Sequence, residues 1–125
     1  MNKTFITPGL SKTAPIISSL AVLYYRHNDP ARALAFGLAA MRLGLVTPQV
    51  VLLVAASFLK TGDAEQALAA LSRFDNSAAR FAEKPTGAQQ SAAALLKAKA
   101  LFRTGALTEA RELLLSANKP SSEGA

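Results

Sequence analysis

The chain of 125 residues has 14 Lys and Arg, 8 Asp and Glu, one His and no Cys, and this length suits one domain or a short array of repeats. The missing cysteines exclude disulfides and thiolate metal sites, and the single histidine, His27, excludes a histidine-based metal cluster. The net charge of +6 is spread along the chain without a Lys/Arg-rich block, which makes nucleic-acid binding a minor alternative.

Residues 1–13 are expected to form a flexible N-terminal segment, because Ser, Gly, Pro and Lys are prominent there. The segment lacks the long apolar core and the small-residue cleavage site of a signal peptide. Further along, the longest uninterrupted apolar stretch, Val50 to Ala56, is far too short to span a bilayer. We therefore expect a cytoplasmic protein without membrane insertion.

Residues 14–47 are predicted to form a helix, a tight turn and a second helix, since Ala and Leu supply most of the apolar content. The turn is placed at Asn28 and Asp29-Pro30. Asn tolerates the left-handed conformation, and Pro fits the first position of a helix. His27 lies beside this turn and is interpreted as an exposed turn residue rather than a catalyst.

Residues 48–81 are predicted to repeat this arrangement. Thr47 is a suitable N-cap with Pro48 at the first helical position, and apolar residues follow at helical spacing. Gly62 suits the left-handed residue that closes a helix, and Asp63 suits the cap of the next one.

A third copy is predicted over residues 91–118, with Gly105 at its turn and Thr108 as the cap of its second helix. Residues 82–90 are interpreted as an insertion within a long connection, which carries one helical turn near residues 78–83. Residues 119–125 are expected to form a flexible tail.

The copies align with one another at constant spacing. Three pairs of residues are each 34 positions apart: Ala21 with Ala55, Tyr24 with Phe58, and Ala33 with Ala67. The third copy follows the second by 43 positions, as Ala98 and Ala110 show. Small residues at these places let two crossing helices approach closely. We therefore predict an all-α fold, an α-solenoid of three helix–turn–helix repeats spanning residues 14–118.

This pattern resembles the tetratricopeptide repeat family, whose 34-residue unit carries small residues, an aromatic and a closing Gly-Asp at these spacings. The matching motifs are Tyr24-Tyr25…Asn28-Asp29…Ala33, Phe58…Gly62-Asp63…Ala67 and Leu101-Phe102…Gly105…Ala110. The family's first-helix Trp is missing, and Ala replaces the small Gly of that helix. The resemblance implies a curved array whose first helices line a concave face.

The resemblance also implies which side chains face that concave groove. The expected partner-binding residues are an apolar set with a basic residue at one edge of each copy: Val22, Tyr25, Arg26, Leu52, Ala56, Leu59, Lys60, Leu95, Lys99, Phe102 and Arg103. Such a groove suits an amphipathic helix or an extended segment with acidic flanks. The basic edge is explained equally well by solvated cations at helix C-termini.

The last predicted helix is rich in leucine. One face of an array cannot hide Leu107, Leu113, Leu114 and Leu115 together, so we expect a second protein or a second copy of the chain to cover them.

The sequence contains no paired carboxylates, nucleophile–base pair or Gly-rich phosphate motif, so we predict a non-enzyme without cofactor or metal. In size, repeat number and groove character the chain resembles the small bacterial type III secretion chaperones. That resemblance implies a chaperone for an aggregation-prone amphipathic helix of a secreted or export-apparatus subunit, with a second small helical protein or a homodimer as further partners.

Two alternatives stay open at this point. The first is a general scaffold or a self-associating assembly protein of a cell-envelope or pilus complex. The second is a nucleic-acid-binding solenoid, which is less favoured because it needs a continuous basic face.

Overall fold

The computed structural model describes residues 8–75, 81 and 83–117, and the regular structure within this range consists of α-helices alone. The helices are α1 (Pro8–Arg26), α2 (Pro30–Arg42), α3 (Pro48–Lys60), α4 (Ala64–Asp75), α5 (Gly87–Arg103) and α6 (Leu107–Ala117). The predicted all-α class is confirmed.

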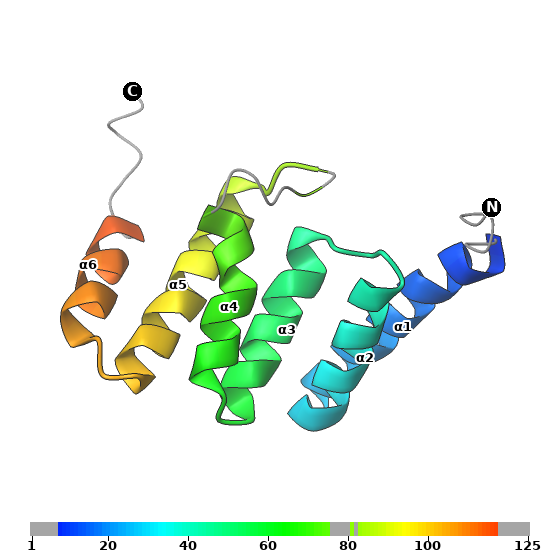
Figure 1. Ribbon diagram of the computed structural model, residues 1–125, viewed down its shortest axis with the longest axis horizontal. Helices are drawn as coiled ribbons and strands as arrows, with labels where there is room; N and C mark the ends of the chain where they lie inside the picture. Colours follow the sequence, from blue (N-terminus) through cyan, green and yellow to red (C-terminus); the bar gives the residue numbers. More distant parts are fainter. Residues whose placement is uncertain (1–7, 76–80, 82, 118–125) are drawn as a thin grey trace.

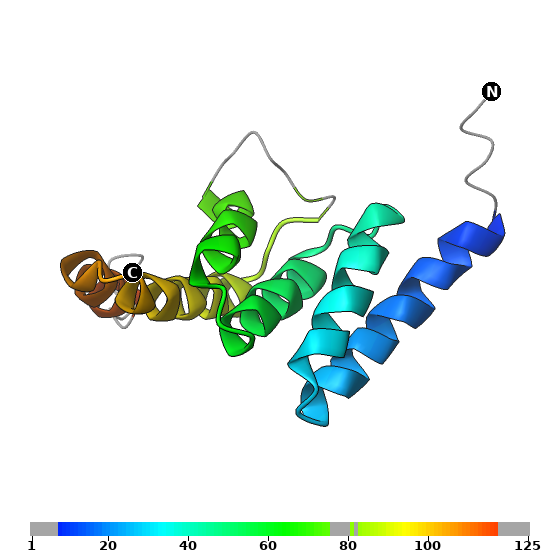
Figure 2. The ribbon, with the colours of Figure 1, turned by 60° about the horizontal axis from the view of Figure 1, so that its bottom comes forward.

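The helices pack in chain order as three hairpins. α1 pairs with α2, α3 with α4 and α5 with α6, while α2 contacts α3 and α4 contacts α5. The central helix α3 also contacts α1 and α5. The hairpins follow one another from one end of the molecule to the other in both views (Figures 1 and 2). The tight turns all lie at one edge (Figure 1), so α1, α3 and α5 run in the same direction.

Each hairpin closes with the same hydrogen-bonded turn. In the second hairpin, the Asp63 N–H donates to the Phe58 carbonyl at 2.8 Å and the Gly62 N–H donates to the Leu59 carbonyl at 3.1 Å. This pair of bonds satisfies carbonyls left free at the end of a helix and requires a left-handed residue. The equivalent bonds recur in the other turns, and the left-handed residues are Asn28 (φ 62°), Gly62 (φ 91°) and Gly105 (φ 93°). All three turn predictions are confirmed.

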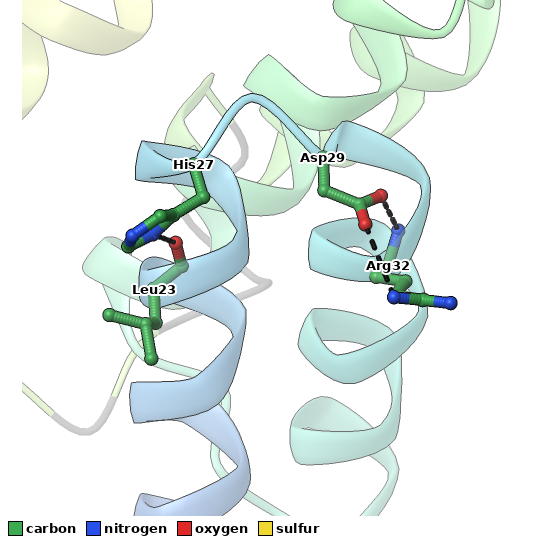
Figure 3. A network of polar contacts seen from close by, with 4 residues as sticks. All are labelled: Leu23, His27, Asp29 and Arg32. Carbon is green, nitrogen blue, oxygen red and sulfur yellow. Dashed lines mark hydrogen bonds and ion pairs between the residues drawn. The ribbon is translucent and has the colours of Figure 1, made fainter.

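The first turn shows how polar side chains finish the two helix ends (Figure 3). The Asp29 carboxylate caps α2 by accepting the Arg32 N–H at 3.2 Å, and it lies 3.6 Å from the Arg32 guanidinium. His27 is exposed, with its Nδ1 2.8 Å from the Leu23 carbonyl. The imidazole therefore contacts a backbone carbonyl at the C-terminal end of α1, in keeping with the interpretation of His27 as a turn residue.

The small residues at the predicted helix crossings are all buried. Each is at most 3% exposed: Ala21, Ala33, Ala55, Ala67, Ala98 and Ala110. Without bulk at these points the two helices of each hairpin approach closely, and larger side chains fill the space beside them. Tyr24, for example, stacks on Phe36 with ring centroids 5.4 Å apart.

Two helices begin earlier than the sequence pattern predicts. α1 begins at Pro8, so residues 8–13 are helical and Pro15 lies inside the helix. α5 begins at Gly87, within the expected insertion, because Thr86 and Gln89 form a capping box. The Thr86 hydroxyl accepts the Gln89 N–H at 3.1 Å, and the Gln89 side chain accepts the Thr86 N–H at 2.9 Å.

Thr108 is not a helix cap. It lies within α6, which begins at Leu107, and the first intrahelical bond runs from the Ala110 N–H to the Ala106 carbonyl. The expected helical turn near residues 78–83 falls largely outside the described residues, and the expected tail at residues 119–125 lies wholly outside them.

Candidate functional site

The described residues carry little that points to metal or membrane chemistry. No group of three or more His, Cys, Asp or Glu side chains among them is arranged to hold a metal ion. In the same part of the chain, no helix is both long and apolar enough to cross a bilayer. The candidate site is instead an apolar cleft.

This cleft, the α5–α6 cleft, lies along one face of the third hairpin and has a volume of about 620 Å³. It is lined by Leu95, Ala98, Lys99, Phe102, Arg103, Leu107, Ala110, Arg111 and Leu114. Four large apolar side chains in it are partly exposed, from 42% for Leu114 to 65% for Phe102. Exposed apolar side chains that gather in one cleft, rather than lying scattered singly, are a feature of interaction sites.

The charge of the cleft is positive. Lys99, Arg103 and Arg111 line it, and none of the described Asp or Glu residues does. Arg103 is held in place because its guanidinium donates a hydrogen bond to the Leu59 carbonyl. The acidic residues of α6, Glu109 and Glu112, line a different cleft. The potential in the α5–α6 cleft therefore favours a ligand with acidic groups at its edges.

The second cleft lies between α4, α5 and α6, and polar or charged residues alternate with leucines along its lining. Asp75 and Lys97 form an ion pair across it at 2.6 Å, and Glu109 and Glu112 add further acidic groups. Its charged groups are mixed in sign, so we do not assign a ligand to it.

The structure brings four of the predicted partner-binding residues together in the α5–α6 cleft: Leu95, Lys99, Phe102 and Arg103. Val22 lies in a separate, smaller cleft with Gly37 and Leu53, which shares no lining residue with the first. Val22 and Phe102 therefore line two different clefts of the described residues.

The remaining predicted residues lie outside the α5–α6 cleft. Tyr25 is half-buried, with the Lys60 ammonium 5.4 Å from its ring centroid. Arg26 is exposed near the same end of the molecule. Leu52 and Ala56 are half-buried, and Leu52 packs against the core.

Leu59 requires a correction, because it is not a surface residue. It is only 4% exposed and belongs to a core cluster with Ala93 and Ala100 of α5. The repeat position of Leu59 does face out of its own hairpin, but α5 lies directly over it. A groove position in one copy thus becomes a core position once the next hairpin is present.

Five of the nine residues that line the cleft were missed by the groove prediction. Leu107, Ala110, Arg111 and Leu114 of α6 line it together with Ala98. The uncovered leucines of the last helix were the sequence signal for this side. The prediction took groove residues only from the first helix of each copy, so it did not combine them with the uncovered leucines of the last helix.

The repeat spacing explains the composition of the cleft. Each of its apolar residues has a counterpart 43 positions earlier in the core cluster under α5: Leu52, Ala55, Leu59, Ala64, Ala67 and Leu71. The exposures differ sharply, since Phe102 is 65% exposed where Leu59 is 4%, and Leu114 is 42% exposed where Leu71 is 1%. The α5–α6 cleft is the equivalent surface, and no helix of the described residues covers it.

Comparison of the chain with protein-family models, curated proteins and solved structures finds no match. Functional assignment therefore depends on the geometry and chemistry of the cleft.

Proposed function

We propose that this protein binds an amphipathic helix of another protein in the α5–α6 cleft and keeps the apolar face of that helix away from water. The observation that carries the proposal is that Phe102 and Leu59 occupy the same repeat position. This position is buried under α5 in the second hairpin and exposed in the third. A surface whose counterpart is covered by a helix is suited in shape and polarity to a helix.

The energetics support binding of useful strength. Fully burying a Leu or Phe side chain stabilises a complex by about 1.5–3 kcal/mol, and the cleft offers four large apolar side chains that are partly exposed. Their burial has to offset the cost of ordering the bound helix and of association. The three basic residues at the cleft mainly set orientation and association rate.

Within this function, the chaperone role implied by the type III secretion resemblance is our preferred assignment. A subunit that polymerises or aggregates through an amphipathic helix needs that helix masked before assembly, and a cleft with cationic edges suits one with acidic flanks. We propose a non-catalytic, cytoplasmic protein of this kind. The alternative is a general scaffold or a self-associating assembly protein; in the self-associating case a second copy would occupy the cleft, and exposed Ile16 and Leu23 on α1 offer a surface for it.

The test compares two Leu→Asp variants of similar exposure. Leu95 lines the cleft at 45% exposure, whereas Leu38 on α2 is 39% exposed and lies outside it. The probe is a synthetic amphipathic helix with a Leu/Ala face and glutamates on its flanks. We expect Leu95→Asp to weaken binding by about tenfold or more, which corresponds to roughly 1.4 kcal/mol, and Leu38→Asp to leave it unchanged.

Binding would be measured by fluorescence anisotropy, with circular dichroism to show that both variants keep their helicity. Equal affinity of the wild-type protein and Leu95→Asp for the probe would count against the cleft as the binding site.

A further inference from the structure

Resting on this proposed function, we infer that the bound helix takes the place of the next helix of the array: it runs parallel to α5 and presents a defined pattern of side chains. The inference follows from the two junctions already present in the molecule. α3 covers the first hairpin and α5 covers the second, and both run in the same direction. The residues with which α3 and α5 contact the preceding hairpins therefore indicate which side chains the third hairpin can accept.

Both covering helices carry the same pattern of residues. Positions are counted from Val50 in α3 and from Ala93 in α5, and the pattern occupies positions 1, 4, 8 and 11. In α3 these are Val50, Leu53, Ser57 and Lys60, and in α5 they are Ala93, Leu96, Ala100 and Arg103. Positions 1 and 8 are buried in both helices and hold small or β-branched residues. The Ser57 hydroxyl has no hydrogen-bond partner among the described residues, so size rather than polarity decides position 8.

Position 11 is basic in both helices and reaches back to the preceding hairpin. The Lys60 ammonium lies over the Tyr25 ring, and the Arg103 guanidinium bonds the Leu59 carbonyl. Tyr25 and Leu59 occupy the repeat position that Phe102 holds in the third hairpin. A Lys or Arg at position 11 of the bound helix would therefore lie over the exposed Phe102 ring and gain a cation–π contact.

Arg111 determines the charge of the opposite flank. Its counterpart in the second hairpin is Leu68, which shares a cleft with Lys97 and Leu101 of α5, at positions 5 and 9. Because Arg111 replaces an apolar residue at this place, positions 5 and 9 of the bound helix face a cation. An acidic residue there makes a favourable pair, which becomes stronger as the interface excludes water.

A second copy of the chain fits this pattern poorly. Its α1 would place Ser19 at position 4 and Leu23 at position 8, where the observed helices have a leucine and a small residue. Residues 8–26 contain no Asp or Glu, so α1 has nothing to pair with Arg111. The cleft therefore favours a helix from a different protein, with the pattern small, Leu, acidic, small, basic at positions 1, 4, 5, 8 and 11.

Two peptides of identical composition test the pattern. The register peptide has Ala, Leu, Glu, Ala and Arg at positions 1, 4, 5, 8 and 11, and the exchanged peptide has Leu and Ala swapped between positions 4 and 8. We expect the register peptide to bind about tenfold more tightly. Equal affinity would overturn this inference and leave the proposed function intact, whereas no binding of either peptide would overturn both.

The position of the acidic residue is tested by charge reversal in a double-mutant cycle. Arg111→Glu should weaken binding of the register peptide, and a peptide with Lys in place of Glu at position 5 should restore it. Affinities that change independently in the cycle would overturn the placement. Light scattering of the protein alone adds a further check, because a dimer that Leu95→Asp dissociates would assign the cleft to a second copy.

Discussion

At the scale of single residues, the junctions between hairpins depend on a trade of side-chain size. Gly37, Leu71 and Leu114 occupy one repeat position. In the first junction the position is a glycine, and a Cβ there would lie 2.8 Å from Cγ2 of Val54. In the second junction it is the buried Leu71, which shares a core cluster with Ala93 and Ala100 of α5, at positions 1 and 8. Leu114 therefore calls for small residues on whatever covers it, as positions 1 and 8 of the pattern require.

This size trade predicts that Gly37→Ala destabilises the protein. The added methyl group must displace Val54, which is fully buried, and overpacking of this kind costs about 1–3 kcal/mol. The higher helix propensity of Ala returns only about 1 kcal/mol. We expect a net loss of about 1 kcal/mol in the free energy of unfolding, measured by urea denaturation. Gly87→Ala is the control, since a Cβ there meets nothing within 4 Å; an equal loss in both variants would contradict the close approach.

At the scale of helices, local polar signals decide where each element begins. The α3 helix starts where Thr47 accepts the Val50 N–H at 3.2 Å, and α4 starts where Asp63 accepts the Gln66 N–H at the same distance. α5 starts at a full capping box, although the repeat spacing predicts a start four residues later. Local capping thus lengthened α5 beyond the part that the repeat pattern defines.

Thr86→Ala should therefore shorten α5 from its N-terminus. The substitution removes the hydroxyl that accepts the Gln89 N–H, and loss of such a cap typically costs about 1 kcal/mol. Thr86→Ser keeps the hydroxyl and should behave like the wild type. Amide hydrogen exchange at residues 88–91, together with urea denaturation, measures both effects. If exchange in this first turn is the same in the Ala and Ser variants, the capping box does not hold the helix start.

At the scale of the whole molecule, the repeated turns were the most predictable feature, and the position of the exposed apolar cleft was the least. Asn28, Gly62 and Gly105 are local signals, since only a few residue types adopt positive φ at low cost. The exposure of a repeat position is not local. Leu59 and Phe102 are equivalent in the sequence pattern, but Leu59 is buried because a helix covers it, whereas Phe102 is exposed. The sequence pattern of one hairpin does not show whether a covering helix is present.

The helices differ in how many neighbouring helices they contact, and this predicts a gradient of stability along the array. α6 packs against α5 and against no other described helix, whereas α3 contacts α1, α2, α4 and α5. Repeat arrays derive their stability from such neighbour contacts. We expect amide hydrogen exchange to be fastest in α6 and slowest in α3, with the exchange of α6 slowed when a helix is bound. Equal protection of all six helices would show that the array unfolds only as one unit.

The central place of α3 has a thermodynamic consequence for detection of a ligand. A helix bound in the α5–α6 cleft would stabilise α5. Because α5 packs against α3, and α3 packs against the first hairpin, part of this stabilisation would extend to the first hairpin. A ligand that binds only the native chain stabilises it by RT ln(1 + [L]/Kd), so at one fixed concentration a tighter ligand raises the melting temperature further. A thermal scan without any label would then serve as a screen, in which candidate sequences are ranked by how far each delays the loss of helical signal.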